Sequence, residues 1–364
     1  MSNASVAGGI RTSLAEHPVH SAALFALLAG AVGLAAGHGS LTDGAILAGY
    51  AALFVPYAVL LVRREGDGLP LWVLIAAAVA VRLAFLPATP ILSDDIYRYV
   101  WDGRVGTSGV NPFMYAPAAE YLAPLRDAHI WERVNHPEIP TIYPPGAQFL
   151  FQGNALLGGS VIGLKGLLLL VEAFCLLGCG WVLVRRTDDG TPWAAEVKRP
   201  FLIYALNPLV FVEVAWSGHL DVAAWGLLVF GLAAWCYSSD LRSAVIGALA
   251  IGSSIAVKFL GLLALPLLAI ENRSKLADAL PRRKRLAVLT IAPLVVAVTY
   301  LPFLDAGPRL FSGFGEYAEA WRGNDGGYRA VWNVSHDSLE AWSSGDSLFH
   351  FATLDGAYQS MGWT

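Results

Sequence analysis

Two adjacent carboxylates, Asp94 and Asp95, lie a few residues after an apolar stretch and precede a run rich in tyrosine, tryptophan and arginine, residues 96–104. A carboxylate at the bilayer centre costs about 2.5 to 3.5 kcal/mol, so acidic residues beside apolar stretches usually serve a purpose at the membrane boundary. The simplest interpretation is that one of them caps a helix. Capping explains a single Asp, and the pair is therefore a candidate for chemistry at a membrane surface.

A second candidate group lies where one apolar stretch ends and the next begins. It contains Glu213, His219 and Asp221. A Ser-Gly-His-x-Asp turn can simply separate two helices, but ionisable groups at membrane depth normally face a polar cavity and a partner. Lys258, between two further apolar runs, either extends to the membrane interface or offers a cation to a phosphate group.

The segment 317–329 combines aromatic residues with Arg322 and Asn324. Such residues belong either to an aromatic belt or to a clamp for a sugar and a phosphate. Both interpretations stay open at this stage.

Metal binding has weak support in the sequence. His129 and His136 have no partner at zinc-ligand spacing, so we expect no zinc site. Asp94 and Asp95 are candidate ligands for Mg²⁺ or Mn²⁺, although an adjacent pair rarely suffices for a cation by itself. There is no glycine-rich nucleotide loop, so we do not expect an activated donor to arrive as a nucleotide.

The composition is that of an integral membrane protein. Hydrophobic residues make up 56% of the chain and charged residues 14%. The net charge of −4 and the short, separated basic clusters argue against nucleic acid as a partner. The three cysteines lie in or beside apolar runs and predict no disulfide framework.

Apolar stretches predict an all-α polytopic membrane protein with about nine transmembrane helices. The segment 146–158 is shorter and is expected to be an interfacial or re-entrant helix. The first stretch could alternatively be a cleaved signal peptide. The nine predicted spans are 19–37, 44–62, 69–88, 161–184, 199–215, 218–237, 241–257, 259–271 and 285–303.

Basic residues predict which connections lie in the cytoplasm. With the amino terminus inside, the positive-inside rule places the pairs Arg63-Arg64 and Arg185-Arg186 and the cluster 282–285 on the inner face. The long loop 89–145, the turn near 214–220, Lys258 and the tail after 304 then all lie outside. The aromatic residues of the long loop suit the headgroup layer, so we expect interfacial helices there.

Several short motifs together resemble the GT-C superfamily of glycosyltransferases, and in particular the bacterial α-mannosyltransferase-like enzymes around glycosyltransferase family 87. The resemblance covers roughly residues 70–335. It rests on the order of the motifs and on their predicted position on the same side of the membrane. The motifs are the run 93–103, the Gly-Val-Asn-Pro turn at 109–112, Asn135-His136-Pro137, the segment 141–145 with Gln148, and Gly218-His219-x-Asp221.

The resemblance implies transfer of a hexose, expected to be mannose, from a polyprenyl-phosphate donor to a hydroxyl of a glycan or glycolipid. It implies a GT-C-like bundle, inversion at the anomeric carbon, and a site on the extracytoplasmic side of the bacterial plasma membrane. Asp94 would be the base, with Asp95 orienting it or a divalent cation, and the two could exchange roles. Candidate phosphate ligands are Lys258, Arg322 and Arg98. Candidate sugar or acceptor ligands are His219, Asp221, Asn324, His136, Tyr143 and Gln148.

The expected organisation has four parts. Residues 1–88 carry the first transmembrane helices, 89–160 the external catalytic loop, 161–304 the helix bundle, and 305–364 an external segment. No span-length apolar run follows residue 330, whereas related enzymes usually continue with further spans. We therefore expect a fragment or a shortened member of the superfamily.

Other functions fit the sequence less well. A carrier or flippase of a lipid-linked or small polar substrate also uses intramembrane charges, but it often shows two similar halves, and no motif recurs here. Prenyl transfer would need spaced Asp clusters, and only one acidic pair is present. A structural membrane subunit is a further alternative.

Overall fold

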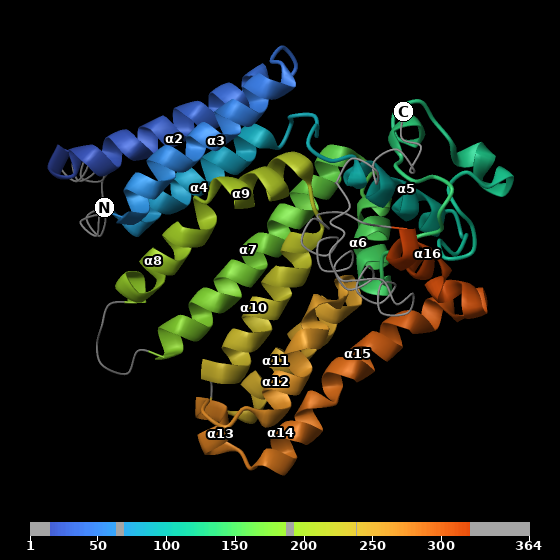
Figure 1. Ribbon diagram of the computed structural model, residues 1–364. Helices are drawn as coiled ribbons and strands as arrows, with labels where there is room; N and C mark the ends of the chain where they lie inside the picture. The colour runs from blue at the N-terminus through green and yellow to red at the C-terminus, as the bar shows by residue number, and fades with distance from the viewer. Residues whose placement is uncertain (1–14, 63–68, 187–192, 238, 321–364) are drawn as a thin grey trace, which may run out of the picture. The chain divides into compact units, whose positions relative to one another are not determined.

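The computed structural model describes residues 15–62, 69–186, 193–237 and 239–320, and all their regular elements are helical (Figure 1). The chain divides into two compact units, 1–314 and 315–364, and the fold described below is that of the first. The predicted parts 1–88, 89–160 and 161–304 therefore lie within one unit, and their division by function stays a prediction.

Four helices in the described residues are long and apolar enough to cross a membrane: Pro18–Gly37 (α2), Asp43–Val62 (α3), Val161–Val184 within α7, and Arg282–Tyr317. A bent pair, Val197–Ala205 and Pro208–Ser217, with a 57° break, brings the number to five if it forms one span. Four shorter apolar helices are Leu71–Phe85, Asp221–Tyr237, Leu241–Val257 and Phe259–Ile270.

Each predicted span is thus helical, but the number of nine crossings is not confirmed. At about 1.5 Å per residue, a helix of about 17 residues is shorter than a hydrocarbon core of about 30 Å. The shorter apolar helices therefore do not qualify by length, and the structure supports four or five spans together with four additional apolar helices.

The helices form a first group of three and a central bundle. The first group is α2, α3 and α4 (Leu71–Phe85), which share a core containing Leu27, Leu53 and Val81. The central bundle joins α7 (Val161–Arg186), α10 (Asp221–Tyr237), α11 (Leu241–Val257) and α15 (Ile291–Tyr300). Gly231 and Gly247 let α10 and α11 approach closely, because a Cβ on Gly231 would lie 2.9 Å from the Gly247 carbonyl oxygen.

The connection from α7 to α10 consists of α8 (Trp193–Ala205), α9 (Pro208–Phe211) and the π-helix η4 (Val212–Ser217), and it contacts both groups of helices. Asn207 caps α9, its side chain accepting a hydrogen bond from the Leu209 N–H. Pro208 then starts the new helix at its first position, where the missing N–H costs nothing. These two residues produce the break that brings η4 to the candidate site described below.

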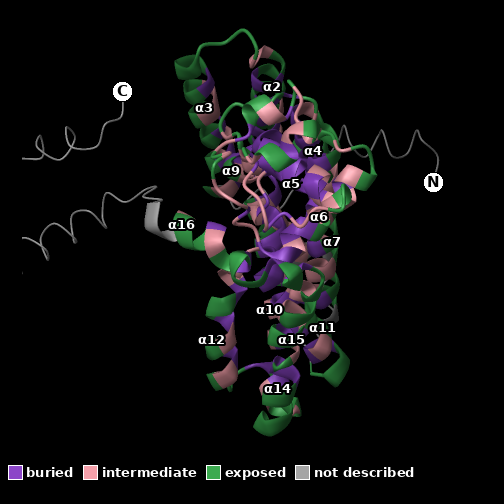
Figure 2. Ribbon diagram, turned by 90° about the vertical axis from the view of Figure 1, so that its right-hand side faces the viewer, coloured by how far each residue is buried: buried purple, intermediate pink, exposed green. Residues whose placement is uncertain are grey.

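The long loop contains α5 (Asp95–Thr107) and the short 3₁₀ helices η2 (Glu120–Leu125) and η3 (Trp131–Arg133), and α6 (Pro145–Leu156) follows it. Figure 2 shows buried residues gathered at α5 and α6. Gly103 permits their contact, because a Cβ there would lie 2.2 Å from the Phe151 carbonyl oxygen. The expectation of aromatic side chains in the headgroup layer fails for α5, where Tyr97, Tyr99 and Trp101 are buried within the protein.

The remaining helices complete the chain. α12 (Ala264–Ile270) leads to a basic turn at the end opposite Lys258, which contains α13 (Lys275–Ala279) and the start of α14 (Arg282–Leu289). Bonds from Arg285 to the Glu271 carbonyl and to the Asn272 side chain hold this turn. The 3₁₀ segments η5 (Phe259–Leu263) and η6 (Leu301–Phe311) and the helix α16 (Ser312–Ala320) are the other elements.

Candidate active site

The two acidic neighbours at the start of α5 have different surroundings. Asp94 is the N-cap residue, but it is exposed and its side chain makes no capping hydrogen bond. Asp95 is the first helical residue. One oxygen of its carboxylate accepts a 2.6 Å hydrogen bond from the Asn135 amide, and the other lies 3.9 Å from Nε2 of His219. The carboxylate of Asp95 is therefore the one that the fold positions.

His219 lies between two carboxylates. Its Nδ1 contacts the Glu213 carboxylate, while Nε2 faces Asp95. Burial disfavours the charged imidazolium, but the hydrogen bond to Glu213 and the charges of Glu213, Asp95 and Asp221 outweigh it, so the pKa of His219 is raised above 6.5. The imidazole is thus held in a position where it keeps its proton more readily than a free histidine does.

The local fold explains how His219 reaches this place. The π-helix η4 ends at Gly218, which has a left-handed backbone with φ of 71°. A Cβ on this residue would lie 2.3 Å from the Cδ1 atom of Ile96 in α5, so only glycine fits without displacement. Single-turn π segments of this kind are frequent at functional sites.

Lys258 and Asp221 form an ion pair. The ammonium group of Lys258 lies 2.7 and 2.8 Å from the two oxygens of Asp221. Asp221 begins α10 and Lys258 follows α11, so antiparallel packing of these helices brings the two together. The Asp221 charge also contributes to the raised pKa of His219, which lies two residues earlier in the chain.

Two aromatic side chains of the long loop, Tyr99 and Tyr143, contact each other. The rings of Tyr99 and Tyr143 meet edge to face at 4.9 Å. Burial raises the pKa of both phenols, and the negative charge of Asp95 raises each further. Both hydroxyls therefore stay protonated at neutral pH and keep a proton to donate.

Two hydrogen bonds also hold the backbone of the segment that leads into α5. The buried ammonium of Lys165 donates to the Ala88 carbonyl at 2.6 Å, and the Trp216 indole donates to the Thr89 carbonyl at 2.8 Å. Lys165 and Asn135 were not among the residues predicted to form the site. Asn135 belongs to a motif of the sequence, but its contact with Asp95 depends on the path of the long loop.

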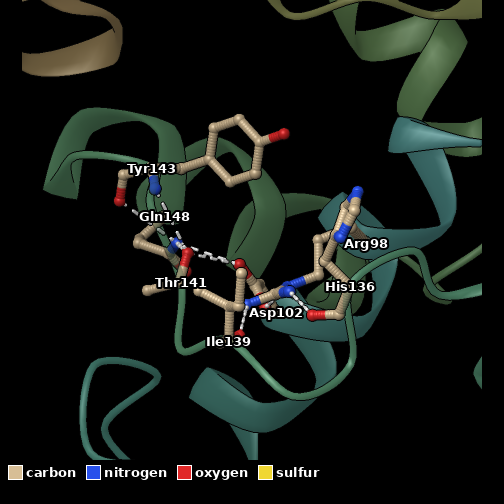
Figure 3. A network of polar contacts seen from close by, with 7 residues as sticks. All are labelled: Arg98, Asp102, His136, Ile139, Thr141, Tyr143 and Gln148. Atoms are coloured by element: carbon tan, nitrogen blue, oxygen red, sulfur yellow. Dashed lines mark hydrogen bonds and ion pairs between the residues drawn. The ribbon is translucent and has the colours of Figure 1, made fainter. Parts of the chain in front are cut away.

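Three predicted ligands are placed differently. Figure 3 shows Arg98 and Gln148 inside a network with Asp102 and Thr141. Arg98 is 5% exposed and donates to Asp102 and to two backbone carbonyls, so its guanidinium faces the protein and not a donor phosphate. Gln148 is fully buried, which removes it from contact with an acceptor. The His136 side chain is exposed and lies beside Glu138.

A family model described as "MptA_B_family: Alpha-(1->6)-mannopyranosyltransferase, N-terminal domain" matches residues 4–272. The chain belongs to this family. The protein is therefore a mannosyltransferase, in agreement with the resemblance of its motifs. A comparison with curated proteins found no match, and neither did a comparison with solved structures.

The part of the mannosyltransferase matched by the family includes Asp95, His219, Asp221 and Lys258. Arg322 and Asn324 follow that part and lie outside the described residues, so their proposed contacts with sugar and phosphate stay predictions. Among the described residues, no group of three or more His, Cys, Asp or Glu side chains has the geometry to hold a metal ion. The expected role of Asp94 and Asp95 as ligands of Mg²⁺ or Mn²⁺ gains no support from that geometry.

Proposed function

We propose that this mannosyltransferase moves mannose from a polyprenyl-phosphate donor to the 6-hydroxyl of an acceptor mannoside, with Asp95 as general base. The observation that carries the proposal is the placement of the Asp95 carboxylate between Asn135 and His219 in a chain of this family. Asp94, exposed at the adjacent position, is the alternative base.

The proposed reaction is a single displacement. The Asp95 carboxylate removes the proton of the acceptor hydroxyl as the acceptor oxygen attacks C1 of the donor mannose. The new C1–O bond forms on the face opposite the phosphate, and the bond from C1 to the phosphate oxygen breaks. A β-linked donor thereby gives an α-linked product, and polyprenyl phosphate leaves with its negative charge.

His219 and Glu213 support the base in this mechanism. The pKa of His219 is raised, and a protonated imidazole 3.9 Å from an oxygen of the Asp95 carboxylate attracts that carboxylate and helps to hold it in place. Glu213 fixes the orientation of the ring through Nδ1, in the way that a carboxylate orients a catalytic histidine elsewhere.

Lys258 is the proposed ligand for the donor phosphate. Asp221 holds its ammonium group through two short contacts, and the third N–H remains available to an anion. Such a cation would stabilise the charge that develops on the departing phosphate. Asp221, His219 and Tyr143 are the proposed partners of the sugar hydroxyls, and a divalent cation is not required by this scheme.

The proposed location of the site is the extracytoplasmic side of a bacterial plasma membrane. The support is that α11 has Lys258 at its end, whereas the basic turn with Arg273, Lys275 and residues 282–285 lies at the other end of the same bundle (Figure 1). Because basic turns are retained in the cytoplasm, the Asp95 end would face outward.

Reconstituted transfer tests the proposal. Purified protein in liposomes receives polyprenyl-phosphate mannose labelled in the sugar, together with a mannoside acceptor, and we expect label to move to the acceptor with an α(1→6) linkage. GDP-mannose in place of the lipid donor should give no product. Transfer from GDP-mannose alone would refute the donor assignment, and uptake of labelled substrate into sealed vesicles without a new glycosidic bond would favour a carrier.

A further inference from the structure

The loop that delivers Asn135 to Asp95 contains an unusual turn. His136 has a φ of 44°, the only positive φ outside glycine among the described residues. A left-handed backbone is unfavourable for a residue that has a side chain. Such a turn persists only where its surroundings hold it, and the side-chain amide of Asn135, the residue directly before it, reaches the Asp95 carboxylate at 2.6 Å.

Arg98 supplies contacts that hold this turn. Its guanidinium donates to the His136 carbonyl at 3.2 Å and to the Ile139 carbonyl at 2.8 Å, while Nε donates to Asp102 at 2.9 Å (Figure 3). A planar guanidinium can serve three acceptors at fixed angles, which a lysine ammonium at the same site does not reproduce. Arg98 also belongs to the first turns of α5, the helix that begins with Asp95.

Buried polar groups also fix the ion pair of Arg98 and Asp102. Thr141 donates to the second Asp102 oxygen at 2.6 Å, and Gln148 of α6 donates to Thr141 at 2.9 Å. Arg98 and Asp102 are almost completely buried, and a buried ion pair recovers little net stability after its charges have lost water. The network is therefore better explained by the geometry that it imposes on residues 135–141 than by a gain in stability.

We propose that Arg98 is a positioning residue, which acts through the carbonyls of His136 and Ile139 to hold Asn135 against the Asp95 carboxylate. The proposal rests on the proposed function of Asp95. It replaces the expectation that Arg98 binds the donor phosphate, because the donors of the guanidinium are directed to the loop and to Asp102.

A double-mutant cycle tests the route of action. Arg98→Lys keeps the charge beside Asp102 but loses the forked contact with the turn, and Asn135→Ala removes the group that the turn presents. We expect each variant to lower kcat by about tenfold to hundredfold, with KM for the lipid donor within about twofold of wild type. The double variant should lose no more than the worse single variant. The proposal would be refuted if the two losses in kcat multiply in the double variant, or if Arg98→Lys raises KM for the lipid donor.

Arg104→Lys is the matched control. Arg104 lies on the same helix, contacts Asp127 at 2.5 Å and donates to the Leu125 carbonyl at 2.9 Å, but it holds another part of the loop. Its effect on kcat should be small and should multiply with that of Asn135→Ala. If the losses in kcat caused by Arg104→Lys and Asn135→Ala also do not multiply in the double variant, the coupling is a general property of the loop and the proposal is wrong.

A measurement without activity separates this inference from the proposed function. Hydrogen exchange by mass spectrometry in detergent should speed up at residues 135–141 in Arg98→Lys and Thr141→Val, and stay at the wild-type rate there in Arg104→Lys. Unchanged exchange in both network variants would refute the positioning role. If exchange is faster in the two network variants but the wild-type protein transfers no mannose, the positioning contacts of Arg98 are supported and the function assigned to Asp95 is wrong.

Discussion

At the residue scale, the start of α5 shows how one carboxylate is selected from two adjacent ones. Asp94 and Asp95 have the same chemistry and consecutive positions, but only Asp95 is given a hydrogen-bond donor from the long loop and an imidazole from the η4 turn. Asp94 is exposed to solvent. A base needs a fixed orientation toward its substrate, and this orientation comes from contacts that Asp94 does not share.

The substitution Asp95→Asn should therefore lower kcat by about 10²- to 10⁴-fold, the usual contribution of a positioned general base. Asp94→Asn should stay within about tenfold of wild type, because it changes an exposed neighbour. Rates of mannose transfer in liposomes, with donor and acceptor saturating, measure both effects. The reverse order of the two losses would transfer the role of base to Asp94.

His219 predicts a specific pH dependence of stability. Its pKa is raised in the folded protein by Glu213, Asp95 and Asp221 against the opposing effect of burial. A raised folded pKa means that the contribution is complete below the unfolded value near 6.5 and is lost as the pH rises through the higher folded value. The Tm advantage of wild type over His219→Gln should consequently be larger at about pH 5.5 than at about pH 8.5.

Thermal unfolding in detergent, monitored by intrinsic fluorescence at the two pH values, provides the comparison. Groups other than His219 titrate in both proteins, so the difference between the proteins isolates the imidazole. A Tm advantage that grows with increasing pH would show that the net environment of His219 favours the neutral ring.

At the element scale, the decisive feature is the broken connection from α8 through α9 to η4. Asn207 and Pro208 end one helix and start the next, and Gly218 then stops the π-helix with a left-handed residue. The result is that His219 lies against the first turn of α5 instead of continuing along a helix. Two elements far apart in sequence are joined at this point by the fit of Gly218 against Ile96.

Gly218→Ala should destabilise the fold and displace His219. The left-handed backbone alone costs alanine about 1 to 2 kcal/mol, and the contact of 2.3 Å with Ile96 adds to this. We expect a lower Tm and a lower rate of mannose transfer, because His219 would no longer be held against Asp95. Gly166→Ala in α7 is the control, because a Cβ there meets nothing within 4 Å. Equal Tm values for the two variants would contradict the fit described for Gly218.

At the scale of the whole molecule, the opposite ends of the bundle have different characters. One end carries Asp95, His219 and Lys258, and the other carries the basic turn held by Arg285 and Glu271. A membrane across the apolar helices would separate these two ends. The number of crossings depends on whether the shorter apolar helices also span the membrane. They are too short to do so by length alone, but they pack among longer helices.

Thiol labelling tests the orientation. In a variant with its native cysteines replaced by serine, a cysteine at the exposed Glu138 should react with a membrane-impermeant maleimide in intact spheroplasts. A cysteine at the exposed Arg283 should react only after the membrane is opened. Labelling of both positions from the same side would refute the proposed topology, and exchanged labelling would place the site in the cytoplasm.

Much of the helical structure could be predicted from the sequence, because the hydrophobic effect acts on composition within short windows. Each predicted apolar span corresponds to a helix or to a pair of helices. The acidic pair, the His219 turn and Lys258 were also recognisable, since ionisable residues beside apolar stretches are costly unless they have partners. The sequence could not predict the depth at which the aromatic residues of α5 lie, because a buried ring and a headgroup-facing ring have the same composition.

The sequence by itself therefore determined the class of protein, its apolar helices and the residue types at its site. Only the tertiary structure decided which carboxylate has partners, that Arg98 serves the loop, and that Asn135 reaches Asp95. The physical reason is range: hydropathy and turn chemistry act between neighbours in the chain. The partners of Asp95 come from residues 135 and 219 and meet it only after the long loop and the broken helix have both folded.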